Sequence, residues 1–238
     1  MDTANDVMLA LEAAVKPGKD AVLGRFFKTG PGQYGEGDVF IGVMVPEQRT
    51  IARRHIGLPL AELETLLASE VHEHRLTALL ILVYAYGAAS GDGAKRRIYF
   101  FYLAHTARIN NWDLVDVTAP NIVGDWLLRA GPTARMATLS RLATSEDLWE
   151  NRIAIVATLA FIRRGQLDDT FHLCERFLGH EHDLMHKACG WMLREAGKRD
   201  ERALCAFLKA HKTRMPRTML RYAIERFDES RRRAFMAT

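Results

Sequence analysis

The segment from Asn110 to Pro120 concentrates residue types that could do chemistry. It reads Asn-Asn-Trp-Asp-Leu-Val-Asp-Val-Thr-Ala-Pro. Trp112 and Asp116 are four residues apart, so a helical turn would project both side chains from one face. A carboxylate and an aromatic ring each stabilise a nearby positive charge. A buried tryptophan followed by helix-capping aspartates is the alternative, and the residue types alone favour that alternative.

Histidines provide the strongest pattern for a metal site. His180, His182 and His186 have a spacing that can hold zinc. They lack the glutamate of an HExxH motif and a matching set of cysteines, so exposed histidines at the start of a helix are the favoured interpretation. His72 and His74 point to opposite sides of a helix and are weaker candidates. We therefore expect no metal.

Glycine-rich and nucleophile motifs do not indicate other chemistry. Gly30 to Gly35 matches GxGxxG, but a dinucleotide site needs a strand before the glycines and a βαβ unit around them. We predict an irregular loop there. The sequence contains no GxSxG, SxxK or paired Cys/His arrangement, so nucleophilic hydrolysis has no support. We expect no cofactor.

Helices must position these residues. Apolar residues recur with helical spacing after residue 46, as at Leu76, Leu79 and Val83, and strand-like alternation is almost absent. The sequence therefore predicts an all-α protein. Pro120 fits the first turn of a helix, and Thr144 and Asp147 match a capping pattern before a long helix that begins near Leu148. Helix breaks are predicted at Gly57–Pro59, Ser90–Gly93, Asn110–Asn111, Gly131–Pro132, Arg164–Gly165, Gly197–Lys198 and Met215–Pro216.

A weak internal repeat runs along the chain. Arg152, Lys187 and Arg217 each come early in a helix that then turns apolar, and stepping back along the chain reaches Asp116 and Arg75. Steps of roughly 30 to 41 residues are typical of a HEAT-like solenoid, in which corresponding positions line one concave surface. These five residues are expected to face the same groove. A chance alignment is the alternative.

The composition is that of a folded soluble protein. Hydrophobic residues make up 48% of the 238 residues and charged residues 26%, which excludes intrinsic disorder and collagen-like repetition. We predict a single domain over residues 1–238. Apolar runs are too short to span a membrane and the start does not resemble a signal peptide, so we expect a cytoplasmic monomer. Cys174, Cys189 and Cys205 are predicted to be buried, reduced thiols.

The net charge of +4 is unevenly distributed. Residues 1–110 carry no net charge, residues 111–185 carry −4 and residues 186–238 carry +8. This pattern favours a polyanion bound along the basic part, with negative charge kept for one specific place. A solvated face together with the exposed run Arg231–Arg233 is the alternative.

The order of these motifs resembles the DNA alkylation repair family of AlkD-type glycosylases. Asn111–Asp116, Gly124-Asp125, Trp149-x-x-Arg152 and Gly190–Glu195 carry the resemblance, and Gly42–Arg49 is similar to the family's N-terminal region. The resemblance covers about residues 25 to 200. It implies a HEAT-like solenoid whose concave face holds duplex DNA. It also implies removal of positively charged alkylpurines, such as 7-alkylguanine and 3-alkyladenine, while the lesion stays largely stacked.

The resemblance assigns a role to four residues. Asp116 matches the family's catalytic carboxylate, Trp112 and Trp191 its aromatic walls, and Arg152 its backbone-contacting arginine. The chain departs from relatives that carry an N-terminal tyrosine, because it reads Arg25-Phe26-Phe27 in that region.

These residues fit a simple mechanism. A purine alkylated at a ring nitrogen is already a competent leaving group, and the sugar that it leaves develops oxocarbenium character. Asp116 would stabilise that cation and orient water, and cations would neutralise phosphates. The expected phosphate contacts are Arg75, Arg152, Lys187 and Arg217. A non-catalytic HEAT-like module that binds nucleic acid or protein is the alternative, and a DNA-junction binder is a third possibility.

Overall fold

Helices form the regular structure of the computed structural model, which describes residues 2–237. The β pairing in these residues is one isolated bridge between Val39 and Val71, so the all-α prediction is confirmed. Packing divides the chain into two units, Met1–Ile122 and Val123–Thr238, and each is described by itself. The boundary lies inside a π-helical segment, Pro120–Gly124. A single domain over residues 1–238 stays a prediction.

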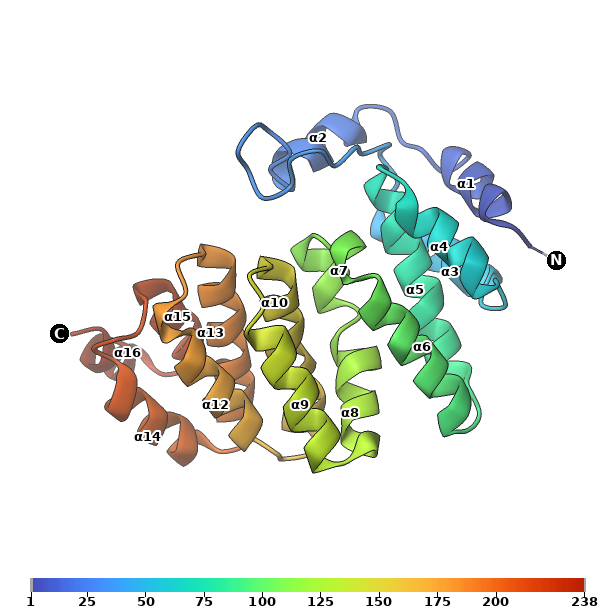
Figure 1. Ribbon diagram of the computed structural model, residues 1–238. Coiled ribbons are helices and arrows are strands. Elements are labelled where there is room, and N and C mark those ends of the chain that lie inside the picture. The colour runs from blue at the N-terminus through green and yellow to red at the C-terminus, as the bar shows by residue number, and fades with distance from the viewer. Residues whose placement is uncertain (1, 238) are drawn as a thin grey trace. The chain divides into compact units, whose positions relative to one another are not determined.

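The first unit is built around α5 (Figure 1). Every residue from His72 to Leu82 is buried, because helices surround this part of α5 on all sides. Helices α1, α3, α4, α6 and α7 all pack on α5. The helices of this unit are α1 (Ala4–Glu12), α2 (Lys19–Phe26), α3 (Val45–Arg54), α4 (Leu60–Ala68), α5 (His72–Ala88), α6 (Asp92–Ala104) and α7 (Trp112–Asp116).

The two helices before residue 46 were not predicted. Helix α1 begins with a capping box in which Thr3 and Asp6 satisfy each other's backbone amides. Helix α2 buries none of its side chains. Its eight residues are fewer than the roughly 11 to 18 over which helical periodicity is recognised, so the pattern did not reveal α2.

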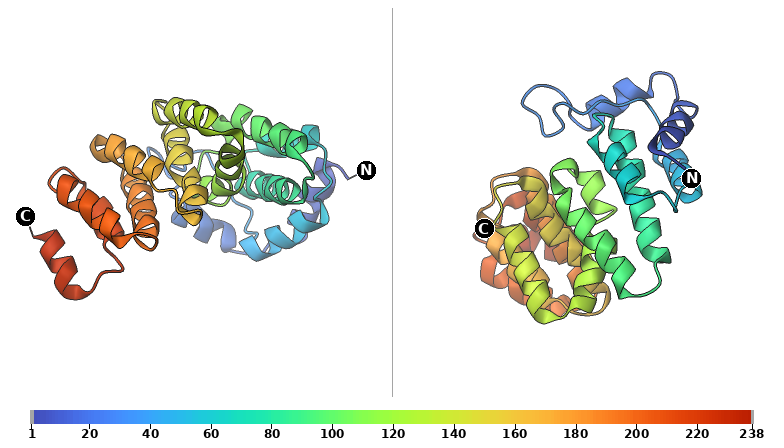
Figure 2. Two further views of the ribbon diagram at one scale, coloured as in Figure 1. Left: turned by 90° about the horizontal axis from the view of Figure 1, so that it is seen from below. Right: turned by 45° about the vertical axis from the view of Figure 1, so that its right-hand side comes forward.

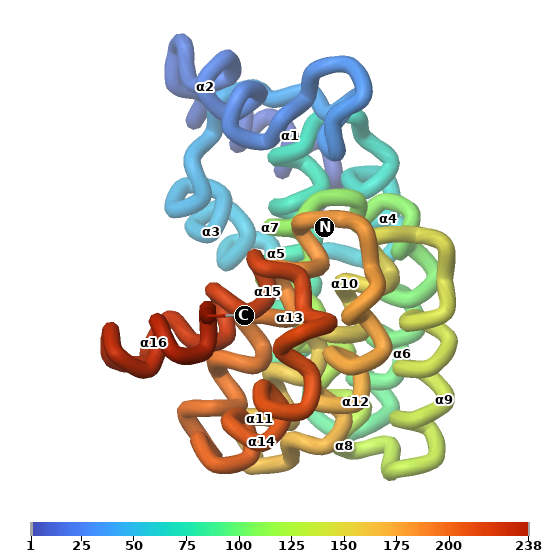
Figure 3. The backbone as a smooth tube through the Cα atoms, turned by 90° about the vertical axis from the view of Figure 1, so that its left-hand side faces the viewer, coloured from blue at the N-terminus to red at the C-terminus, as the bar shows by residue number. Residues whose placement is uncertain are grey.

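The second unit is a row of antiparallel helices (Figures 1 and 2). Helix α10 packs against α9 and α13, and α13 packs against α15. Residues 151–162 are all buried, so α10 and α11 form the centre of this unit. Figure 3 shows α16 projecting beyond α15. The helices are α8 (Asp125–Ala130), α9 (Pro132–Ala143), α10 (Leu148–Ala157), α11 (Leu159–Arg163), α12 (Asp168–Arg176), α13 (Asp183–Gly197), α14 (Glu201–His211), α15 (Arg217–Ala223) and α16 (Glu229–Met236).

The predicted breaks coincide with helix ends, but one predicted cap is wrong. Helix α10 begins at Leu148 as expected, yet its N-cap is Asp147, whose carboxylate accepts from the Trp149 amide at 2.6 Å. Thr144 instead donates its hydroxyl to Ser140 O, at the end of α9. The expected long helix also divides at Thr158 into α10 and α11.

Gly190 allows two helices of the second unit to pack closely. A Cβ atom at this position would lie 2.6 Å from Met219 O and 2.5 Å from the Tyr222 Cβ atom. No side chain fits there, so glycine lets α13 and α15 approach backbone to backbone. The glycine of the Gly-Trp pair therefore has a packing role beside Trp191.

The three cysteines differ in how deeply they are buried. Cys174 and Cys189 are buried free thiols, as predicted, whereas Cys205 is partly exposed. Burial raises the pKa of the Cys174 thiol well above its ordinary value, so this thiol stays protonated.

Within residues 2–237, no helix has the length and apolar character needed to cross a membrane.

Candidate active site

Helix α7 presents Trp112 and Asp116 from a rigid support. Asn111 caps it, because its side-chain oxygen accepts from the Trp112 amide at 2.8 Å. Leu114 and Val115 are fully buried and anchor its opposite face. Trp112 and Asp116 remain partly exposed, and four residues of helix place both on the same side. The predicted helical turn is thus confirmed.

A buried chain of hydroxyl groups holds the C-terminal end of α7. Thr118 Oγ1 donates to Leu114 O at 2.5 Å, and Tyr102 Oη lies 2.9 Å from Thr118 Oγ1. Burial raises the pKa of Tyr102, and the negative charge of Asp116 acts in the same direction. Tyr102 therefore stays a neutral phenol, and the Asp116 carboxylate lies within electrostatic range of it.

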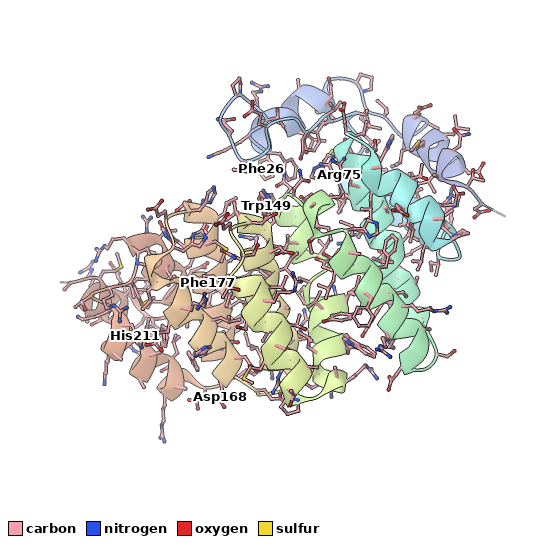
Figure 4. All side chains as sticks on the ribbon, in the orientation of Figure 1. Phe26, Arg75, Trp149, Asp168, Phe177 and His211 are labelled. Carbon is pink, nitrogen blue, oxygen red and sulfur yellow. The ribbon has the colours of Figure 1, made fainter. Side chains whose placement is uncertain are left out.

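Two phenylalanines lie against Trp112. The Phe27 ring stacks on Trp112 at a centroid distance of 5.3 Å, and Phe26 meets Trp112 edge-on at 5.9 Å. Phe27 is buried and also stacks on Phe40 at 5.0 Å, whereas Phe26 is 62% exposed (Figure 4). Sequence reasoning noted these two residues only as a departure from relatives. The signal that could have placed them is the pair of adjacent aromatic residues at the end of the short α2 segment.

A buried network of charged side chains lies below this aromatic cluster. Asp38 Oδ1 accepts from Arg75 Nη2 at 2.5 Å, and Asp38 Oδ2 lies 3.0 Å from His72 Nδ1. The other ring nitrogen, His72 Nε2, lies 2.8 Å from Asp113 Oδ2. Asn111 joins the network, because its side-chain amide donates to Asp38 Oδ2 at 3.1 Å. Sequence reasoning did not find this network, which joins segments more than 30 residues apart.

The charges of this network stabilise one another. Burial lowers the pKa of His72, but the charge and hydrogen bond of Asp113, together with those of Asp38, outweigh burial and raise the pKa to about 9. Burial raises the pKa of Asp38, but the His72 hydrogen bond and the charge of Arg75 outweigh it and leave this pKa below its usual value. His72 is therefore protonated and Asp38 is ionised near neutral pH.

Arg75, for which a phosphate contact was expected, is enclosed within the first unit. Arg75 is 1% exposed, and its terminal nitrogens donate to Asp38, Ser69 O and Glu70 O. A guanidinium that is enclosed in this way cannot reach a phosphate at the surface. As the internal repeat predicts, Arg75 comes early in a helix, in the first turn of α5, but its side chain points into the unit.

Arg152 is also largely enclosed. It is 4% exposed, and its Nη1 atom donates to Leu184 O at 2.6 Å. This bond joins α10 to the first turn of α13. A direct contact of Arg152 with the DNA backbone stays a prediction.

Lys187 and Arg217 leave more of their surface exposed. Lys187 Nζ pairs with Asp183 Oδ2 at 2.7 Å, and 40% of the Lys187 side chain is exposed. Arg217 begins α15, is exposed, and donates to Met236 O at 2.7 Å. The Asp183 carboxylate links the two helices, because it accepts from Lys187 and also from the Thr218 hydroxyl. Lys187 and Arg217 therefore belong to adjacent, connected turns.

Cations gather at the start of α13. Burial lowers the pKa of His182, and the charges of Arg152 and Lys187 lower it further, against the opposing effect of Asp183. Both cations must therefore lie near His182. Arg152 and Lys187 thus lie near the same turn, and a groove shared by all five positions of the internal repeat stays a prediction.

Trp191 lies one turn beyond Lys187 on α13. It is partly exposed and lines an open cavity of about 510 Å³. Leu159, Ile162 and Arg163 of α11 form the wall that faces α13. The cavity therefore offers an apolar and a cationic surface beside the indole ring.

The three histidines of the possible zinc motif serve local structure. His180 Nδ1 accepts from the His182 amide at 3.1 Å, and His182 Nδ1 accepts from the Leu184 amide at 3.1 Å as the N-cap of α13. His186 Nε2 bonds to His180 O. In residues 2–237 no group of three His, Cys, Asp or Glu side chains could hold a metal ion.

Comparison with known proteins supplies a family and a fold. Residues 7–227 match the family model described as DNA alkylation repair enzyme. No curated protein matches the chain. The structure is similar to that of a predicted DNA alkylation repair enzyme from Enterococcus faecalis, with a TM-score of 0.71, 17% sequence identity, and coverage of 90% of this chain and 97% of that chain. At this identity the similarity shows the fold alone, and it agrees with the predicted helical-repeat class.

Proposed function

Because the chain belongs to the DNA alkylation repair enzyme family, we propose that it is a DNA glycosylase that excises positively charged alkylpurines from duplex DNA. The expected substrates are 7-alkylguanine and 3-alkyladenine. The protein would act in DNA repair and release the free base by breaking the N-glycosidic bond.

The observation that carries this proposal is the presentation of Trp112 and Asp116. A catalytic carboxylate must be held at one distance and direction from the sugar, since misplacement by about 1 Å can cost on the order of 100-fold in rate. Helix α7 meets this need, because buried Leu114 and Val115 fix one face and the Asn111 cap fixes its start. An aromatic face and a carboxylate thus project together from a support that cannot easily move.

The proposed chemistry needs few groups. An alkylated purine carries positive charge and departs without a general acid, so the remaining task is to stabilise the sugar cation. Asp116 supplies negative charge and orients the attacking water, and the Trp112 ring offers its negative face to the same cation. Trp191 supplies a second aromatic face in this proposal.

Duplex binding is assigned to the cations of the second unit. Lys187 and Arg217 contact phosphates, since both are exposed enough to do so and their turns are joined through Asp183. Arg152 orients the turn that carries Lys187 through its bond to Leu184 O. Its proposed contact with the DNA backbone is limited to the edge that burial leaves open.

The decisive experiment measures release of free base from matched duplexes. One duplex carries a single 7-methylguanine, a second carries the neutral base hypoxanthine at the same position, and a third is undamaged. We expect release from the first duplex alone, because a neutral base needs a proton donor that the proposal does not include. Binding of all three duplexes without release would identify a non-catalytic nucleic-acid-binding module instead.

A further inference from the structure

The hydrogen bonds of His72 define its protonation state. Both ring nitrogens lie within 3.0 Å of a carboxylate oxygen, Nδ1 of Asp38 and Nε2 of Asp113. An ionised carboxylate can only accept, so each ring nitrogen must donate. Only the imidazolium carries two N–H groups. Between two ionised carboxylates, the geometry therefore requires a charged histidine, and this one is 1% exposed.

The surroundings of this imidazolium balance its charge. Along the network two cations, Arg75 and His72, alternate with two carboxylates, Asp38 and Asp113, so the buried group is neutral as a whole. Phe40 stacks on the His72 ring at 4.6 Å and Phe27 lies at 5.0 Å, and these aromatic neighbours help to keep the 1% exposed imidazole away from water. Buried ions are tolerated when they are paired in this way, and removing one partner is costly.

The network grips α7 on both sides of Trp112. His72 holds Asp113, the residue after Trp112, and Asp38 holds the amide of Asn111, the residue before it. Phe27, which packs on His72, also stacks on the Trp112 ring itself. A movement of the imidazole would therefore shift the Trp112 backbone through Asn111 and Asp113, and the Trp112 ring through Phe27.

We propose that His72 is a positioning residue: clamped between Asp38 and Asp113, it fixes the first turn of α7 and so the directions in which Trp112 and Asp116 project. Its consequence for base excision rests on the proposed function. Its consequence for the geometry of α7 does not.

Other charged groups near His72 have separate partners. Glu73, the next residue of α5, accepts from the amides of Ile41, Gly42 and Val43. Arg108 donates to carbonyl groups of residues 67–69. Asp38 and Asp113 are thus the groups that face the imidazole, with Arg75 acting through Asp38.

Nuclear magnetic resonance tests the geometry directly. In protein with ¹⁵N-labelled histidine, both ring nitrogens of His72 should be protonated at pH 7. In protein with fluorinated tryptophan, His72→Gln should shift the Trp112 resonance, identified by its absence in Trp112→Phe. His74→Gln is the matched control, because His74 lies on the same helix, is 8% exposed, and contacts Ser69 rather than α7. A neutral His72 or an unmoved Trp112 signal would overturn the proposal.

Excision kinetics test the consequence. In single turnover, His72→Gln should slow release of 7-methylguanine by about 10- to 100-fold. Duplex affinity should stay within about threefold, because the carboxylate acts mainly on the transition state. His74→Gln should keep the wild-type rate. Equal rates for both folded variants would contradict the proposal, whereas an inactive wild-type protein would contradict the proposed function and leave the resonance test intact.

If His72→Gln does not fold, the wild-type protein decides the question. Raising the pH until His72 loses one ring proton should shift the Trp112 fluorine resonance with the same midpoint. The proposal would be overturned if the Trp112 resonance did not shift when His72 loses this proton.

Discussion

Asp116 ends a helix whose other face is buried, and it keeps part of its own surface open. That combination suits a group that must hold one position and still meet a ligand. Arg75 has the opposite combination, since its charge is enclosed and paired with Asp38 within the unit. Asp116 and Arg75 hold corresponding positions in the internal repeat, but they differ in burial and in hydrogen-bond partners.

For Asp116, we expect Asp116→Asn to lose most base release, with a barrier higher by roughly 2 to 4 kcal/mol. The amide has the shape of the carboxylate but lacks its charge, so duplex affinity should change little. Single-turnover release and equilibrium binding to a 7-methylguanine duplex measure the two effects. Asp125→Asn, which removes a surface pair with Arg129, is the control. Full release by a folded Asp116→Asn variant would exclude Asp116 from the site.

For His72, we expect the stability that it contributes to depend on pH. Its pKa is raised from about 6.5 to about 9 in the folded state, so the folded state binds the proton more tightly. The contribution is complete below pH 6.5 and is lost as the pH rises through 9. The shift corresponds to about 3 kcal/mol.

Urea unfolding of wild-type protein and His72→Gln at several pH values measures this contribution. The difference in their free energies of unfolding should be largest near pH 6 and should shrink toward pH 9. A difference that is constant or grows with pH would show that His72 is neutral in the folded state.

At the scale of elements, close contacts decide how the helices are spaced. Helices α13 and α15 touch at Gly190, where a Cβ atom would meet backbone and side-chain atoms of α15. The spacing of these two helices in turn sets the separation of Lys187 from Arg217. A packing residue therefore controls the arrangement of two proposed DNA contacts.

Gly190→Ala should destabilise the protein by roughly 1 to 3 kcal/mol, because α13 and α15 must separate to admit the methyl group. Gly87→Ala is the matched control. Gly87 also lies within a helix, α5, but has open space around it, so alanine there should be neutral or stabilise by up to about 1 kcal/mol. Thermal and urea unfolding measure both variants. Equal stability of the two variants would show that α15 moves aside without cost.

At the scale of the whole molecule, charge is segregated along the chain. The last 53 residues carry a net charge of +8, and the proposed phosphate contacts Lys187 and Arg217 lie among them. Each phosphate contact releases counterions from DNA, so it contributes to the salt dependence of binding whether or not the duplex is damaged.

Lys187→Ala and Arg217→Ala should each lower the slope of log affinity against log salt by about 1. Arg164→Ala is the control, because Arg164 is exposed at the C-terminal end of α11 and belongs to no proposed contact. Titrations of an undamaged duplex at several salt concentrations give the slopes. If all three folded variants kept the wild-type slope, the DNA would have to bind on another surface.

The sequence by itself determined the helical architecture of this protein. Helix breaks, caps and apolar stripes are local patterns, and the residues that form them are close along the chain. The α7 segment belongs to this class, because Asn111, Trp112 and Asp116 lie within six positions. Helix α2 was not predicted, because its eight residues are too few for a helical period to stand out from the sequence.

Only the tertiary structure decided which distant residues meet. Asp38, His72 and Asp113 come from three segments of the chain, and their bonds depend on where α5 places its first turn relative to α7. A charged residue that is predicted to contact DNA can instead be buried where a carboxylate and backbone carbonyl groups accept its hydrogen bonds, and no local pattern records those partners. That is why Arg75 was expected to meet DNA and instead holds Asp38 beneath the candidate site.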